Sequence, residues 1–155
     1  MTGETWTILW DEYTADTYLY GSKVIYHKKD DVEFFNPLMP PGTIIKKWYS
    51  KTDYKSQRIE PQLPMIDGES AYEITVNIDV PKGQSCLIRL VFFDRYGQEA
   101  GYLNVWDKKM DFKCPLKTYS YCMQLVNGGM NHFHFHNIVI REKENDAGKN
   151  NKKTK

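Results

Sequence analysis

Short segments in which apolar and polar residues alternate run through most of this chain. The clearest covers residues 71–80, where every second residue is apolar: Tyr72, Ile74, Val76, Ile78 and Val80. Because successive side chains of a strand point to opposite faces, this spacing predicts a half-buried β-strand with its apolar residues on one face. The residues Pro81–Gly83 then predict a turn that ends the strand.

Seven further segments predict strands in the same way. Residues 86–93 (CLIRLVFF) are apolar at every position except Arg89, which is typical of a central strand buried on both faces. The other six lie at residues 5–10, 24–26, 102–106, 110–113, 119–125 and 133–141. No segment shows a helical period over ten residues or more. The pattern therefore predicts an all-β domain, a β-sandwich of the jelly-roll kind.

Two parts of the chain lack this alternation. Prolines crowd residues 36–42 (NPLMPPG) and 61–64, and between them lie a short apolar-then-basic run and a polar stretch. We interpret this region as one long ordered loop, and long loops in compact domains are often functional. Beyond Arg141 the sequence EKENDAGKNNKKTK has almost no apolar residue. We therefore expect one domain over residues 1–141 and a disordered polar tail over residues 142–155.

Composition narrows the function classes. The 155 residues suffice for one domain with a core, and the formal charge of +1 gives no field that would attract nucleic acid or an anionic membrane. The three cysteines, Cys86, Cys114 and Cys122, are odd in number and lack paired spacing, which disfavours a disulfide framework or a structural zinc site. Free thiols, no signal peptide and no apolar run long enough to span a bilayer together predict a cytoplasmic protein.

The aromatic content, 14% of the residues, points to binding. Tryptophan and tyrosine rings stack on sugars or clamp peptide segments when they lie at the surface. We expect four aromatic residues of the loop region and of one turn to bind a partner or a sugar: Trp48, Tyr49, Tyr54 and Tyr96. The other tryptophans lie within strand patterns and are expected in the core: Trp6, Trp10 and Trp106.

The sharpest chemical motif is HFHFH at residues 132–136. At a period of two, His132, His134 and His136 project from one face of a strand, and such imidazoles can hold zinc or iron. A metal-dependent enzyme of the cupin type would need further ligands, yet the only other histidine is His27 and the motif contains no carboxylate. The alternative is that the two phenylalanines face the core while the histidines face solvent or a groove. We favour this alternative, with no metal.

The sequence contains no other catalytic constellation. The chain lacks a GxSxG nucleophile elbow, a glycine-rich phosphate loop and a dinucleotide fingerprint. None of its cysteines lies in the polar, basic surroundings that activate a thiol. A spatial pair of carboxylates for glycoside chemistry stays open, because 20 acidic residues offer many chance pairs. We expect a protein that is not an enzyme and needs no cofactor.

Three segments carry a family resemblance. They are FFNPLMPPGTIIKKWYSKTDY (34–54), FFDRYGQE (92–99) and FHFHNIVI (133–140). Together they resemble the third accessory secretory protein of the accessory Sec system of Gram-positive bacteria, and the likeness extends over nearly the whole chain. The last segment also resembles the closing strand of carbohydrate-binding modules. In the family pattern His136 fits, whereas the position of His134 need not be histidine, so a three-histidine site would be particular to this chain.

This resemblance implies a cytoplasmic, non-enzymatic β-sandwich that assembles with the first and second accessory secretory proteins. Together these proteins help the accessory Sec ATPase to deliver a glycosylated, serine-rich repeat adhesin to a dedicated membrane channel. Contact with the inner face of the membrane would then run through partners, and self-association is left open. The family provides no catalytic residues to carry over to this chain.

Two alternatives remain beside this reading. One is a free-standing carbohydrate-binding module that stacks N-acetylglucosamine-type sugars on Trp48, Tyr49 or Tyr96. The other is the metal-dependent enzyme centred on the three histidines of the HFHFH motif. The three hypotheses differ in what the purified protein retains, which is partner proteins, sugar or metal.

Overall fold

The computed structural model describes residues 5–10, 17–50, 63, 64, 66 and 70–143. They form ten strands: β1 (Thr5–Ile8), β2 (Lys23–Lys28), β3 (Asp31–Phe35), β4 (Ile44–Tyr49), β5 (Ala71–Asp79), β6 (Cys86–Phe93), β7 (Glu99–Val105), β8 (Lys109–Lys113), β9 (Ser120–Asn127) and β10 (His132–Glu142). The predicted all-β class is confirmed. In this part of the chain no helix is long and apolar enough to cross a membrane.

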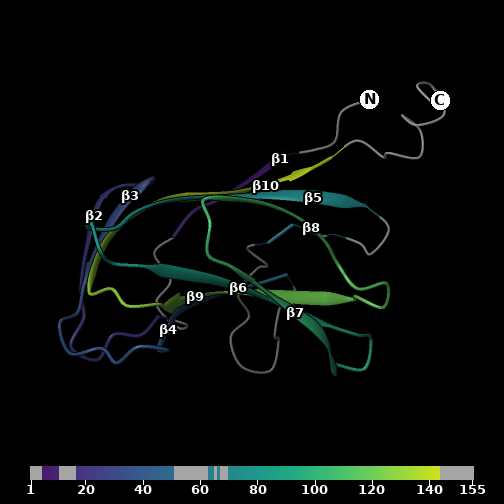
Figure 1. The fold of residues 1–155 in the computed structure, drawn as a ribbon, viewed down its shortest axis with the longest axis horizontal. Coiled ribbons are helices and arrows are strands. Elements are labelled where there is room, and N and C mark those ends of the chain that lie inside the picture. Colours follow the sequence, from purple (N-terminus) through teal and green to yellow (C-terminus); the bar gives the residue numbers. More distant parts are fainter. Residues whose placement is uncertain (1–4, 11–16, 51–62, 65, 67–69, 144–155) are drawn as a thin grey trace.

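The strands form two antiparallel sheets that face each other (Figure 1). Sheet A has the order β2-β3-β10-β5-β8, and sheet B has the order β4-β9-β6-β7. The last strand, β10, is the centre of sheet A. It pairs with β3 over residues 132–135, with β1 over residues 138–141 and with β5 along its other side. The predicted β-sandwich is therefore confirmed.

The inner faces of the two sheets enclose a core with an aromatic centre. Five aromatic side chains there have no exposed surface: Trp10, Phe34, Trp48, Phe133 and Phe135. The ring of Phe135 contacts two tryptophans, with centroid distances of 5.4 Å to Trp10 and 5.5 Å to Trp48. The indole Nε1 of Trp48 donates a hydrogen bond to the carbonyl of Leu9 at 3.0 Å. The core position predicted for Trp10 is confirmed, and Trp6 is partly buried against this core.

Two strands lie where the sequence did not predict them. In β4 a bulge shifts the register between Ile44 and Lys46, so that Ile45 and Lys46 are both buried and the alternation is broken. The expected loop is therefore wrong for residues 44–49. By contrast β3 alternates fully, with Val32 and Phe34 buried, but it is only five residues long.

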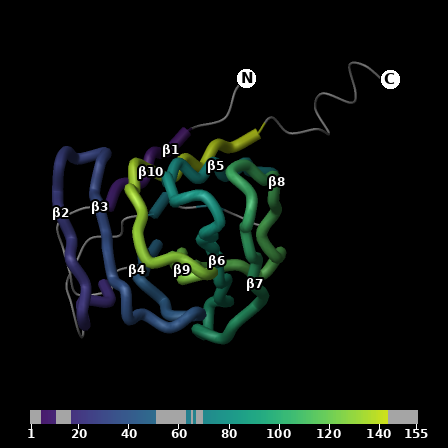
Figure 2. The backbone as a smooth tube through the Cα atoms, turned by 60° about the vertical axis from the view of Figure 1, so that its left-hand side comes forward, coloured from purple at the N-terminus to yellow at the C-terminus, as the bar shows by residue number. Residues whose placement is uncertain are grey.

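Residues 36–43, which we call the proline strap, cross from β3 in sheet A to β4 in sheet B (Figure 2). Two buried asparagines hold the strap. The Oδ1 atom of Asn36 accepts a hydrogen bond from the backbone N–H of Leu38 at 3.0 Å. At the end of β9, Nδ2 of Asn127 donates to the carbonyls of Met39 and Pro40 at 3.2 and 3.0 Å. The strap is thus an ordered connection between the sheets.

Candidate functional site: a histidine cluster on the outer face of sheet A

All four histidines of the chain lie on the outer face of sheet A. On β10 the two phenylalanines of the HFHFH motif are buried in the core, while His132, His134 and His136 point outward and are half-buried. This is the arrangement that alternation along a strand predicts. The fourth histidine, His27, lies on β2, and its ring stacks on that of His134 with centroids 5.9 Å apart. Residues more than a hundred positions apart thus meet on one surface.

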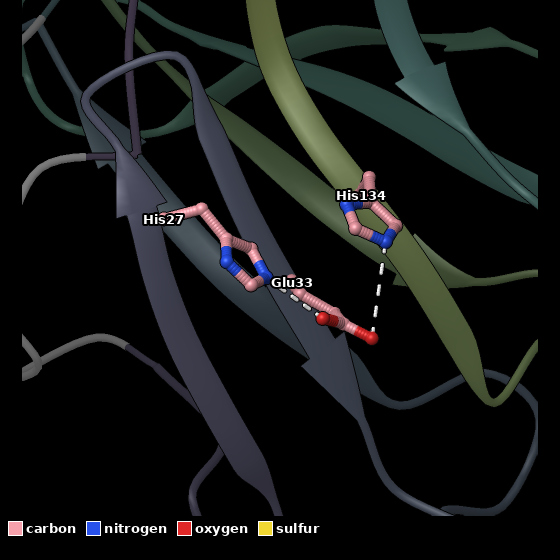
Figure 3. A group of neighbouring side chains, drawn as sticks. All are labelled: His27, Glu33 and His134. Carbon is pink, nitrogen blue, oxygen red and sulfur yellow. Dashed lines mark hydrogen bonds and ion pairs between the residues drawn. The ribbon is translucent and has the colours of Figure 1, made fainter.

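The carboxylates that hold these imidazoles come from β3, which lies between β2 and β10. The two oxygens of Glu33 accept hydrogen bonds from Nε2 of His27 at 2.8 Å and from Nε2 of His132 at 2.7 Å. Oδ1 of Asp31 accepts a hydrogen bond from Nδ1 of His134 at 2.9 Å. The other nitrogen of His134, Nε2, faces the Glu33 carboxylate at 3.8 Å (Figure 3). Glu33 therefore lies at the centre of the arrangement.

A separate partner on β5 holds His136. Its Nε2 lies 2.9 Å from Oδ2 of Asp79, and its Nδ1 lies 2.7 Å from the carbonyl oxygen of Asp30. Both partners are hydrogen-bond acceptors, so both bonds form at once only when the imidazole carries two protons. The bond to Asp79 and then the bond to Asp30 raise the pKa of His136 above its ordinary value. We call the following seven residues the histidine cluster: His27, Asp31, Glu33, Asp79, His132, His134 and His136.

The imidazoles in turn keep the β3 carboxylates ionised. Hydrogen bonds from His27 and His132 lower the pKa of Glu33 to about 2. The hydrogen bond from His134 also lowers the pKa of Asp31. The centre of the cluster therefore carries fixed negative charge, with neutral or protonated imidazoles around it. Such a surface can hold protons or a cation.

Replacing Asp79 by asparagine is expected to lower the pKa of His136 toward its ordinary value, because an amide supplies no negative charge. The raised pKa stabilises the folded protein fully below the ordinary histidine value of about 6.5, and this contribution is lost as the pH rises through the pKa of the folded state. NMR titration of the His136 ring, in chelator-treated wild-type and Asp79→Asn proteins, measures the shift. The same His136 pKa in both proteins would contradict this role for Asp79.

A groove of about 470 Å³ opens beside the cluster. Glu33 and His132 form part of its wall, together with Lys23 and the apolar side chains of Ile25 and Phe35. The groove therefore combines both signs of charge with an apolar strip. This gives a small polar molecule or a peptide side chain access to the edge of the cluster.

The aromatic residues predicted to bind partners or sugar are not brought together. Trp48 is fully buried in the core, so the surface position expected for it is wrong. Tyr49 is half-buried at the end of β4, and Tyr96 is 81% exposed in the turn between β6 and β7. Tyr54 lies outside the described residues. Trp106, expected in the core, is instead 58% exposed just after β7, because the strand ends at the residue before it.

Sequence reasoning missed the carboxylates of the cluster and the role of His27. The residues Asp31, Glu33 and Asp79 lie far from the HFHFH motif in sequence and reach it only through strand pairing. A signal was present in the DVEFF segment, where two acidic residues alternate with two buried apolar ones. An alternating acidic strand can place its carboxylates opposite an alternating histidine strand when the two pair in register.

Comparison with known proteins shows the family to which this chain belongs. A family model described as "Accessory Sec secretory system ASP3" matches residues 17–142, most of the chain. The chain belongs to the ASP3 family. The accessory Sec system protein ASP3 of Streptococcus gordonii is 37% identical over 126 residues, which cover 81% of this chain and 79% of that protein. The resemblance that the sequence motifs indicated is therefore confirmed.

A second ASP3 relative, from Staphylococcus aureus, is 24% identical over 139 residues, and these are 90% of this chain but 43% of that protein. The chain thus spans less than half the length of this relative. Among solved structures, one chain of the glycosylation-associated protein complex of Streptococcus agalactiae has a TM-score of 0.82 at 30% identity, with 90% of this chain and 44% of that chain covered.

Another neighbour is a chain in the crystal structure of accessory secretory proteins 1, 2 and 3 of Streptococcus pneumoniae. It has a TM-score of 0.81 at 32% identity, and the match covers 88% of this chain and 94% of that chain. The CBM22-1 xylan-binding domain of Paenibacillus barcinonensis has a TM-score of 0.51 at 11% identity, covering 91% of this chain and 96% of that domain. The likeness to the xylan-binding domain concerns the fold alone.

Proposed function

We propose that this chain is a non-catalytic subunit of the accessory Sec export machinery. In this role it binds the first and second accessory secretory proteins and assists delivery of a glycosylated serine-rich repeat adhesin to the accessory Sec ATPase and channel. The observation that carries the proposal is the match to a chain solved among accessory secretory proteins 1, 2 and 3, which covers 94% of that chain's length. The protein would act in the cytoplasm and reach the inner face of the membrane through these partners.

The chemistry of the described residues supports a role without catalysis. The four histidines hydrogen bond to carboxylates or to a carbonyl, and not to a serine or cysteine that they could activate. Burial raises the pKa of the Cys86 and Cys122 thiols, which keeps them protonated and poorly nucleophilic. These thiols are therefore structural in the proposed subunit.

The edge of sheet B formed by β7 is our candidate for the partner surface. Within the described residues β7 pairs only with β6, so one side of its backbone is available to another chain. Proteins protect such edges with lysine or proline, and the edge strands β2 and β8 of sheet A each carry two lysines. At the other edge of sheet B, Lys46 of β4 pairs with Thr17 through an isolated bridge. The sequence of β7, EAGYLNV, has neither residue type. Of the two edges of sheet B, the one formed by β7 is therefore the less protected.

Exposed aromatic residues reinforce this choice. Tyr102 on β7 is 62% exposed, and Trp106 follows the end of the strand. Near the start of β7 lie two further exposed tyrosines, Tyr96 in the turn and Tyr119, whose backbone N–H donates to the carbonyl of Phe93. Aromatic side chains are enriched at protein interfaces and carry a large share of their binding energy. We propose that this edge contacts the first or second accessory secretory protein.

Mixing the purified chain with the first and second accessory secretory proteins is expected to give one complex that elutes together. Replacing Tyr102 and Trp106 by alanine should weaken that complex by at least about tenfold, since such anchors typically contribute more than about 1.4 kcal/mol each. Size-exclusion chromatography with light scattering measures the complex and its stoichiometry, and titration calorimetry measures the affinity.

The matched control is Tyr20→Ala, which removes an aromatic ring that is 79% exposed in the turn before β2. Its complex should have the affinity of the wild type. Separate elution of the wild-type chain from both partners would contradict the proposed function. An intact complex with the double variant would contradict only the choice of the β7 edge.

A further inference from the structure

Three neighbouring strands bring potential metal ligands together on the outer face of sheet A. His27 lies on β2, Glu33 on β3 and His134 on β10, and the Cα atoms of Glu33 and His134 are direct partners in the β-ladder. One ligand atom from each residue lies within 4.8 Å of the others. In Figure 3 both imidazoles turn a ring nitrogen toward the Glu33 carboxylate, which lies between them. The three side chains therefore converge without any change in the backbone.

A second observation concerns the orientation of His134. Metal-bound histidines almost always donate their other ring N–H to a carboxylate or a carbonyl, which fixes the tautomer and the ring orientation. Asp31 provides this carboxylate, at 2.9 Å from Nδ1 of His134. In the neutral imidazole Nε2 is then unprotonated, and its lone pair is available for a metal.

The spacing of the ligand atoms is also suitable. Two atoms that each lie about 2.0–2.1 Å from a tetrahedral zinc ion are about 3.4 Å apart. Nε2 of His134 lies 3.8 Å from the nearer Glu33 oxygen, too far for a hydrogen bond but close to this separation. On the other side, Nε2 of His27 lies 2.8 Å from the second Glu33 oxygen, and an ion that binds there displaces the proton of this hydrogen bond to solvent. A small rotation of the side chains, which are half-buried or exposed, would accommodate an ion.

We propose that His27, Glu33 and His134 bind a divalent transition metal ion, with zinc as the best match to two imidazoles and one carboxylate. Asp31 orients His134 in this site. His132 donates to Oε2 of Glu33 at 2.7 Å and holds the carboxylate in place. Three protein ligands leave one position of a tetrahedral zinc ion open to solvent.

This inference is independent of the proposed function, because the site lies on sheet A and the candidate partner edge lies on sheet B. It also differs from the three-histidine site considered from the sequence. His136 is held by Asp79 and by the carbonyl of Asp30, so both of its nitrogens are occupied. The ligand set instead includes one residue from each of three strands.

Titration of the untagged, chelator-stripped full chain with Zn²⁺ tests the proposal. Calorimetry is expected to show one ion bound per chain at neutral pH, with weaker binding at acidic pH because protons compete for the imidazoles. Titration with Co²⁺ gives a second measurement. It should produce visible bands of a four- or five-coordinate ion without the strong near-ultraviolet absorption of cobalt bound to thiolate.

The zinc affinities of single variants distinguish the proposed ligands from the other residues of the histidine cluster. Asp31→Asn should weaken zinc binding by about 10–100-fold, as expected when the partner of a ligating histidine is lost. His27→Ala, His134→Ala and Glu33→Gln should each weaken it further, while His136→Ala should bind like the wild type. Circular dichroism and urea unfolding of each variant establish that it is folded, and Glu33→Gln preserves the shape of the side chain.

Three results would overturn the proposal. The first is no zinc binding by the wild type in the millimolar range. The second is stoichiometric binding that survives both His27→Ala and His134→Ala. The third is thiolate absorption in the cobalt complex, which would place the ion on a cysteine.

Discussion

Replacing Phe135 by alanine is expected to lower the free energy of unfolding by about 3–5 kcal/mol, the usual cost of removing a buried phenylalanine ring. The ring has no exposed surface and contacts Trp10 edge-on and Trp48 in a stack. Because these tryptophans are packed between the two sheets, they cannot move far enough to fill the cavity. Urea unfolding followed by tryptophan fluorescence measures the change.

A matched control removes an aromatic ring from the surface. Tyr96→Ala deletes a side chain that is 81% exposed, and it should change the free energy of unfolding by no more than about 0.5 kcal/mol. Phe135→Leu keeps much of the side-chain volume and replaces the alanine variant if that variant does not fold. Its free energy of unfolding should be lower than that of the wild type, by less than the alanine variant's decrease. Equal stability of Phe135→Ala and Tyr96→Ala would contradict the aromatic core described for this sandwich.

Replacing Asn127 by alanine is expected to have the second large effect, a decrease of about 2–4 kcal/mol in the free energy of unfolding. The amide Nδ2 donates to the carbonyls of Met39 and Pro40 in the proline strap. Its Oδ1 accepts hydrogen bonds from the backbone N–H groups of Gly129 and Met130 at 2.9 and 2.7 Å. Alanine leaves these groups without partners in a buried region, and each such group costs about 1–3 kcal/mol, although the costs do not add fully.

The control for this variant is Asn104→Ala. Asn104 is half-buried and accepts a hydrogen bond from Nε of Arg89 at 2.9 Å, so its loss should cost about 1 kcal/mol. Hydrogen exchange provides a local measurement, because the amides of the proline strap should exchange faster in Asn127→Ala and not in Asn104→Ala. Similar stability and exchange in both variants would mean that Asn127 does not fix the strap.

The strands with an unbroken pattern were predictable from the sequence. Residues 71–79 alternate without interruption because one face of β5 packs against the core and the other faces outward. The strand at residues 86–93 was predicted with its observed bounds and as a central strand, but the predicted burial on both faces is wrong, because Val91 and Phe93 on its outer face are only half-buried. The strand β4 was not, because its bulge buries the neighbouring residues Ile45 and Lys46 and thereby hides the period of two.

The candidate site was predictable only in part, for a related reason. Alternation within β10 is a local property, so the outward direction of the three motif histidines followed from the sequence. The contacts of Glu33 with His27 and His132 depend on which strands are neighbours and on their register. The local pattern of apolar and polar residues shows neither which strands are neighbours nor how they are aligned. Trp48 was misplaced because β4 was expected to be a loop, and Trp106 because β7 ends at the residue before it.

The central position of β10 in sheet A has a consequence for the order of events during synthesis. This strand pairs with β1, β3 and β5, yet it leaves the ribosome after all of them. At about 5–20 residues per second, the hundred or so residues between β3 and β10 take roughly 5–20 s to appear. Throughout that interval the nascent chain exposes strand edges that only its last strand can cover. A chaperone that shields those edges would therefore raise the yield of folded protein without changing its stability.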